Sequence, residues 1–71
     1  MQLTKAQTRF LKELELFIDN NGYAPTTREL VELLDYRSNN AVRFHLINLK
    51  SLGYIDYVDG KSRTIKVLKS I

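Results

Sequence analysis

The sequence contains no cysteine and a single histidine, His45, and both shortages narrow the kinds of site that the chain can hold. Without cysteine it can have no disulfide framework and no thiolate metal site. One histidine cannot supply a multi-histidine metal site, so we expect no metal and no cofactor. The 71 residues give room for one domain, residues 1–71, with a modest core of aliphatic and aromatic side chains.

Long apolar runs and catalytic motifs are also missing. The apolar stretches are only a few residues long, far short of a membrane span, and no apolar segment follows Met1 as it would in a secretory signal. By default we expect a cytoplasmic protein with no membrane partner. The chain has no Gly-x-Ser-x-Gly motif, and Gly22, Gly53 and Gly60 are isolated rather than gathered in a phosphate-binding loop. We therefore do not expect an enzyme.

The charge that is present is divided unevenly along the chain. Residues 1–35 carry four basic and six acidic side chains, a net charge of −2, whereas residues 36–71 carry seven basic and two acidic ones, a net charge of +5. Such an imbalance indicates that a polyanion binds mainly to the second half. A solvated surface that only keeps the protein soluble is the alternative, and composition does not decide between the two.

Helix signals fill the first half of the chain. Thr4 and Gln7 have capping-box spacing, and apolar residues then recur every three or four positions until about residue 21, where Gly22 can end the helix in a left-handed conformation. Thr26 and Glu29 repeat the capping-box spacing. They predict a short second helix that ends near residue 35.

A third helix and a hairpin complete the predicted fold. Ser38 is a good N-cap for a helix that runs to about Leu52, and two short helices joined by a tight turn are typical of a helix-turn-helix. Two segments rich in β-branched and aromatic residues, 54–58 and 64–68, flank the turn dipeptide Asp59-Gly60. This order predicts an α+β fold, a three-helix winged helix-turn-helix with a C-terminal β-hairpin wing.

The third predicted helix has two different faces. At about 100° per residue, the core side carries Val42, Leu46 and Leu49, with Leu52 and His45 on one shoulder. The opposite side carries Asn40, Arg43, Phe44, Ile47 and Ser51. This exposed combination suits the major groove of DNA, because Asn can bond adenine, Arg can bond guanine and apolar groups can pack on thymine methyls. Asn40, Arg43 and Phe44, near the start of the helix, are the first candidates for base contacts, and Ile47 follows them.

Each of these residues also has a structural interpretation. Phe44 and Ile47 can pack against the first helix, the wing or a partner subunit. Asn39 and Asn40 can simply cap or solvate the start of the helix. His45 is expected to be a packing residue on the shoulder of the core rather than a DNA contact.

Four basic residues surround the third helix or lie in the wing. Arg37 and Lys50 flank the helix, and each can either neutralise a phosphate or remain a solvated surface charge. Lys61 and Arg63 lie in the wing, where the convergence of several basic groups favours phosphate contacts.

The motifs of the chain, taken in order, resemble the N-terminal DNA-binding domain of the LexA repressors from about Leu3 to Leu68. The resemblance is carried, at matching spacing, by residues 3–7 (LTKAQ), 21–30 (NGYAPTTREL), 36–42 (YRSNNAV), 45–46 (HL) and 49–55 (LKSLGYI). It implies a winged helix-turn-helix that binds short palindromic operators in double-stranded DNA and represses transcription. It also implies that the operator bases are met by Ser38, Asn40, Ala41, Arg43 and Phe44.

Three departures from the family pattern qualify this expectation. Nothing in the sequence corresponds to the dimerising serine-peptidase domain with which LexA repressors cleave themselves in the DNA-damage response. We therefore expect a stand-alone regulator without self-cleavage, such as a phage or mobile element would encode. The pair Arg43-Phe44 replaces an acidic pair, and because carboxylates accept hydrogen bonds from cytosine, the preferred bases should differ. Asp35 replaces a common glycine, which the fold should tolerate because aspartate adopts positive φ more readily than most residues.

Two functions remain open at this point. The first is a sequence-specific transcriptional regulator that binds DNA alone or as a homodimer on a palindromic operator. The second is a protein-binding winged helix, an antirepressor or corepressor that pairs with a LexA-type repressor, since a fold does not fix a function. A third interpretation is that the chain is the excised DNA-binding half of a longer repressor.

Overall fold

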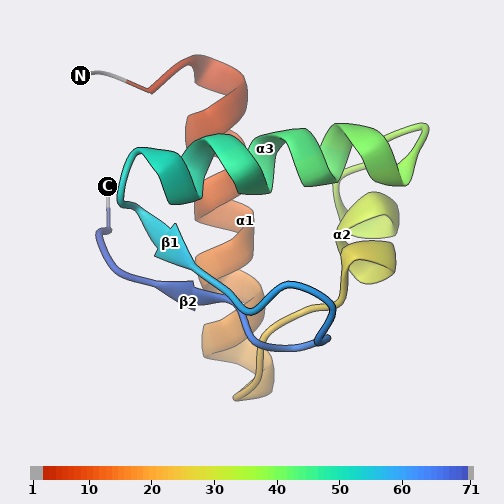
Figure 1. Cartoon of the computed structure of the whole chain (residues 1–71). Helices are drawn as coiled ribbons and strands as arrows, with labels where there is room; N and C mark the ends of the chain where they lie inside the picture. The colour runs from red at the N-terminus through yellow and green to blue at the C-terminus, as the bar shows by residue number, and fades with distance from the viewer. Residues whose placement is uncertain (1–2, 71) are drawn as a thin grey trace.

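The computed structural model describes residues 3–70, which form three helices followed by a two-stranded antiparallel hairpin (Figure 1). The helices are α1 (Lys5–Asn21), α2 (Thr27–Leu33) and α3 (Asn39–Ser51), and the strands are β1 (Ile55–Asp56) and β2 (Lys66–Val67). In Figure 1, α3 crosses in front of α1, α2 lies at one end of α3, and the hairpin runs below it. The predicted winged helix-turn-helix is confirmed. No helix of residues 3–70 is long and apolar enough to cross a membrane.

Both predicted capping boxes are present. The hydroxyl of Thr4 accepts from the backbone N–H of Gln7 at 3.1 Å, and the amide oxygen of Gln7 accepts from the N–H of Thr4 at 2.9 Å. Thr26 and Glu29 exchange the same pair of bonds at 3.1 and 2.9 Å. Each box satisfies donors that a helix start would otherwise leave unpaired. Gly22 closes α1 as expected, with φ 76°.

The turn between α2 and α3 differs in detail from the prediction. Helix α2 ends at Leu33, and Asp35, predicted as the last helical residue, has φ 58° in the turn. Asp35 thus adopts the positive φ that the sequence led us to expect. Ser38 is the N-cap residue of α3, but its side chain makes no capping hydrogen bond. Its exposed hydroxyl is therefore left for another partner.

The hairpin is shorter than predicted. Only Ile55 pairs with Val67 and Asp56 with Lys66, instead of the whole of segments 54–58 and 64–68. Beyond these pairs the Thr64 hydroxyl bonds to the opposite arm of the hairpin. It accepts a hydrogen bond from the N–H of Val58 at 2.9 Å and donates towards the carbonyl of the same residue. A side chain thus takes the place of the next backbone pair of the two strands, at the two ends of the wing loop, residues 58–64.

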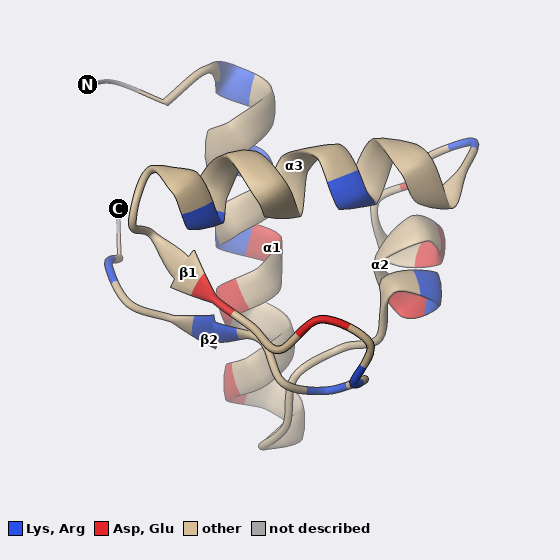
Figure 2. Ribbon diagram, viewed as in Figure 1, with Lys and Arg blue, Asp and Glu red and all other residues tan. Residues whose placement is uncertain are grey.

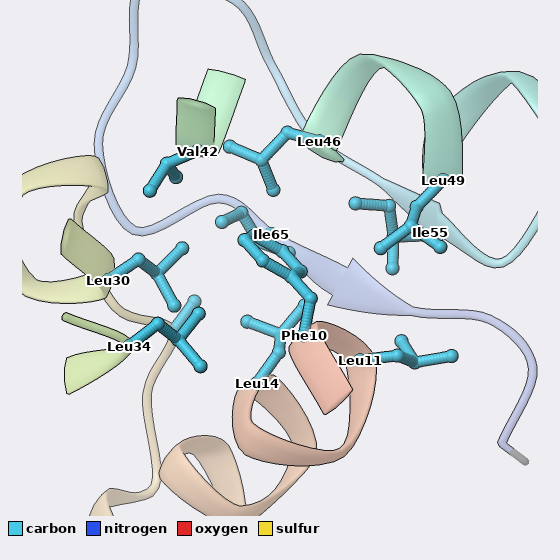
Figure 3. Close-up of a cluster of buried hydrophobic side chains, with 11 residues drawn as sticks. Phe10, Leu11, Leu14, Leu30, Leu34, Val42, Leu46, Leu49, Ile55 and Ile65 are labelled. Carbon is cyan, nitrogen blue, oxygen red and sulfur yellow. The ribbon is translucent and has the colours of Figure 1, made fainter. Parts of the chain in front are cut away.

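One hydrophobic core holds the elements together (Figure 3). All three helices and both arms of the hairpin contribute to it, and it contains no buried polar or charged residue. Its members are Phe10, Leu11, Leu14, Ala24, Leu30, Leu34, Val42, Leu46, Leu49, Ile55 and Ile65. Because Ile55 and Ile65 insert from the hairpin, the wing is anchored beside α3 by buried apolar area.

Candidate nucleic-acid interface

The outer face of α3 is as apolar as the sequence predicted. Phe44 is 63% exposed and Ile47 57% exposed, although large apolar side chains are usually buried. Asn39, Asn40 and Arg43 are also exposed, and Ala41 is half-buried among them. The side chains of Val42, Leu46 and Leu49 form the core side of the same helix. The two predicted faces of α3 are confirmed.

His45 lies between these two faces, in a row of aromatic rings. Its ring centroid is 5.3 Å from that of Phe10 on α1 and 5.6 Å from that of Tyr36 in the turn. Phe44 touches it edge-on at 6.2 Å. The expected packing role of His45 is therefore confirmed. Burial lowers its pKa below the usual value, because a charged imidazole would lose water in this place.

A groove of about 500 Å³ separates α3 from the wing. Its walls come from the start of α2, from one edge of α3 and from the wing loop. The polar and apolar groups that face it include Thr27, Arg28, Asn39, Arg43, Ile47 and Lys61. Sequence reasoning did not single out Thr27 and Arg28. The capping box at Thr26 could have pointed to them, because it places both residues in the first turn of α2.

Arg63, a predicted phosphate contact, lies against the start of α2. Its guanidinium makes two hydrogen bonds to the carboxylate of Glu29, at 2.9 and 3.2 Å, and a third to the carbonyl of Ala24 at 3.1 Å. It also covers the ring of Tyr23 at 4.7 Å. The Thr26 backbone bond, followed by the bond from Arg63, lowers the pKa of Glu29. Arg63 thus fastens the wing loop to α2.

Lys50 is another residue that the sequence offers as a phosphate contact. It connects the end of α3 to the hairpin. Its ammonium donates to the carbonyl of Tyr57 at 3.1 Å and lies 3.5 Å from the carboxylate of Asp56. It also sits 4.5 Å from the centre of the Tyr57 ring. Lys50 and Arg63 therefore hold the wing from two sides.

Arg37, Arg43 and Lys61 differ from Lys50 and Arg63, because their side chains make no hydrogen bond or cation-π contact with any residue that the structure describes. Within residues 3–70 none of these three cations forms an ion pair, and all are exposed. Arg37 lies in the turn before α3, Arg43 on α3 itself and Lys61 in the wing loop, where Figure 2 shows basic positions around the front of the molecule. Together with Ser38 and Asn39, they surround the exposed face of α3 with groups that can bind an anion.

A family model described as the LexA DNA binding domain matches residues 1–64. The chain belongs to this family. A LexA repressor from Desulfatibacillum aliphaticivorans is 41% identical over 96% of this chain and 34% of that protein. The transcription regulator LexA of Synechocystis is 35% identical over 93% of the chain and 32% of its own length. A LexA repressor from Thermotoga petrophila is 41% identical, with coverages of 97% and 34%.

The matches confirm the resemblance seen in the motifs and agree with the fold. This LexA-type domain spans about a third of the length of the relatives that it matches. Its matched region includes all three helices and the whole wing loop. The exposed face of α3, and every residue that lines the groove beside it except Ile65, therefore lie in the region matched by the family model.

Proposed function

We propose that this LexA-type domain is a sequence-specific transcriptional regulator that binds double-stranded DNA with α3 in the major groove. The observation that carries the proposal is the outer face of α3. There an amide, a guanidinium and two apolar side chains are exposed together and flanked by the groove of the wing. A helix fits the major groove, and its first turns usually reach the base edges. Asn40, Arg43 and Phe44 are in those turns, and Ile47 follows one turn later.

The four side chains make two kinds of base contact in the proposal, polar and apolar. Asn40 offers a donor and an acceptor that match adenine, and the guanidinium of Arg43 matches the two acceptors of guanine. Phe44 and Ile47 pack on thymine methyl groups, which explains why apolar side chains remain exposed beside polar ones. An arginine cannot accept a hydrogen bond from cytosine, so the preferred operator differs from one that is read by acidic residues.

Phosphate contacts position the helix in this proposal. Arg37 and Lys61 are the leading cations, because both are exposed and no carboxylate within residues 3–70 pairs with them. Asn39 lies in the first turn of α3, where its amide can meet the sugar-phosphate chain. Ser38 and Ala41, at the same end of the helix, add the base contacts that the resemblance to the family implies. Lys50 and Arg63 act mainly by fixing the wing, since both already have protein partners.

We further propose regulation by occupancy of the DNA, with two copies on a palindromic operator. One domain of this size covers few phosphates, whereas two half-sites on the same duplex would combine their binding energies. No catalytic step by the domain enters this proposal.

The direct test is selection of duplexes from a random library, followed by fluorescence anisotropy with the enriched and a scrambled duplex. Enrichment of one motif and weaker binding to the scrambled duplex support the proposal. Symmetric half-sites one helical turn or a multiple apart support two copies. A selection that enriches no motif, or an enriched duplex that binds no more tightly than the scrambled one, would contradict sequence-specific binding.

A protein-binding role is the second candidate, and the exposure of Phe44 and Ile47 is the observation that favours it. In that case the domain would pair with a LexA-type repressor as an antirepressor or corepressor. Co-purification of such a repressor after nuclease treatment, together with a selection that enriches no duplex, would decide for this function.

A further inference from the structure

We infer that the groove between α2, α3 and the wing loop holds the sugar-phosphate chain of one DNA strand, with Arg28 of α2 and Lys61 of the wing loop on its two sides. This inference rests on the proposed function and deepens it. It adds Arg28 as a phosphate contact, and it assigns both cations to the same strand. The groove, about 500 Å³ in volume, is called here the wing groove.

The wing groove opens along the edge of α3 that is proposed to read the bases. Arg43 and Ile47, two members of the exposed face, line it together with Asn39 in the first turn of the helix. A helix in the major groove of DNA lies between the two phosphate chains that border it. The chain on the side of the wing would therefore pass beside Arg43 and Ile47, where the wing groove lies.

The wing groove is mainly basic. Its charged lining residues are the basic Arg28, Arg43, Lys61 and Arg63 and the acidic Asp59. Figure 2 shows basic positions on α2, on α3 and in the wing loop around it. Arg63 is paired with Glu29, and the proposed function assigns Arg43 to the bases. The other two cations, Arg28 and Lys61, are left for phosphate groups.

Arg28 forms no ion pair within residues 3–70, although a carboxylate lies at suitable spacing. Glu32 follows it by four positions, the interval at which opposite charges pair on a helix, yet the two side chains do not pair. The side chain of Arg28 is exposed and lines the wing groove instead. A guanidinium in this position can bind a phosphate through two parallel N–H groups.

The ion pair between Arg63 and Glu29 fixes the two walls that carry these cations. Glu29 is the residue after Arg28 in α2. Arg63 follows Lys61 by two positions in the wing loop. The pair, together with the bond from Arg63 to the carbonyl of Ala24, thus joins the loop to α2 next to both cations. Walls that are already in place need less ordering when a strand binds between them, which favours binding.

The test combines variants of the protein with variants of single phosphates. R28Q and K61Q each remove one cation of the wing groove. R9Q is the matched control, because Arg9 is an exposed arginine of α1 that does not line this groove. Each protein is titrated by fluorescence anisotropy against the selected duplex and against duplexes in which one phosphate at a time is a neutral methylphosphonate. The salt dependence is measured on the unmodified duplex, and thermal melts check the fold.

R28Q should lower the salt slope by about 0.9, the value for one phosphate contact, whereas R9Q should leave it close to that of the wild type. Between 50 and 200 mM salt the wild type should then lose roughly 3-fold more affinity than R28Q. Base preference and melting temperature of R28Q should not change, since Arg28 is exposed and forms no ion pair in the described structure.

The methylphosphonates should locate the contact. At one position the neutral phosphate should weaken the wild type several-fold and R28Q not at all, because the variant has already lost that contact. The position that behaves in this way for K61Q should be the same phosphate or a neighbour on the same strand.

Three results would overturn the inference. Equal changes of the salt slope in R28Q and R9Q would mean that only net charge matters. If every methylphosphonate weakens the wild type and R28Q equally, Arg28 contacts no phosphate. If the phosphates of Arg28 and Lys61 lie on different strands, the wing groove does not hold one chain. Each result would leave the proposed function intact, whereas a wild type that binds no duplex would refute both.

Discussion

The guanidinium of Arg63 in the wing and the carboxylate of Glu29 in α2 form a bidentate ion pair, although the two residues are 34 positions apart in the sequence. The same carboxylate accepts the backbone N–H of Thr26 and so completes the capping box of α2. One side chain thus caps the first helix of the helix-turn-helix and holds the wing. The position of the wing relative to α3 is consequently coupled to the start of α2.

This coupling predicts that Arg63→Ala loosens the wing. The variant loses the pair with Glu29 and the bond to the carbonyl of Ala24, and we expect a small but measurable loss in the free energy of unfolding, because the pair is exposed to solvent. Hydrogen exchange at Val58 and Lys61 should become faster. Lys61→Ala, in the same loop, is the control and should leave urea-induced unfolding unchanged. Equal unfolding curves for wild type and Arg63→Ala would contradict the bracing role.

The lowered pKa of His45 predicts a stability that declines in mild acid. Between about pH 6.5, the ordinary value, and the lower value in the fold, the unfolded chain binds a proton that the folded chain does not. The contribution of His45 to the free energy of unfolding should therefore be constant above pH 6.5, fall as the pH decreases from 6.5 towards the lowered pKa, and level off below it. The buried Nδ1 of His45 has no hydrogen-bond partner in the described structure, so protonation there gains nothing.

Urea-induced unfolding at pH 7.5, 6.5 and 5.5 measures this dependence. The variant His45→Leu should show a flatter profile, since His45 is the single histidine of the chain. A wild type whose stability rises between pH 6.5 and 5.5 would contradict the expected sign.

Base and phosphate contacts should respond differently to substitution. Arg43→Ala should cost about 1–3 kcal/mol on the selected duplex and relax the preference at one base position. Lys61→Ala should weaken all duplexes to a similar extent and lower the salt slope by about 0.9. Anisotropy titrations against single-base variants of the duplex separate the two effects. A uniform loss for Arg43→Ala would remove it from base recognition.

The two faces of α3 predict opposite effects of truncating an apolar side chain. Leu49→Ala creates a cavity in the core and should reduce the free energy of unfolding by about 2–5 kcal/mol. Ile47→Ala changes an exposed position and should alter it by less than about 0.5 kcal/mol, while it weakens DNA binding. Thermal melts and anisotropy on both variants provide the comparison. A large loss of stability for Ile47→Ala would mean that Ile47 packs inside the protein.

Features that depend on neighbours in sequence were predictable. Thr4 and Gln7, like Thr26 and Glu29, are three residues apart, so their reciprocal bonds follow from local helix geometry. The two faces of α3 followed from periodicity, because the buried and exposed sets repeat every three or four residues. The positive φ of Asp35 was expected from its place in the family pattern.

Features that depend on distant contacts were not predictable in the same way. The sequence identifies Arg63 as a basic wing residue, but not that Glu29, 34 positions earlier, accepts its hydrogen bonds. The strands end early because the Thr64 hydroxyl bonds to the backbone of Val58, a competition that strand propensity does not include. The role of Lys50 as a bridge likewise required the folded position of Tyr57.

The most direct test of the central claim is an NMR titration of the ¹⁵N-labelled domain with the selected duplex. The largest amide shifts are expected at residues 38–47 and in the wing loop. The acidic half of α1, residues 13–21, should hardly change. Shifts centred on that acidic half, or none on α3 at saturating duplex, would contradict DNA reading by the exposed face of α3.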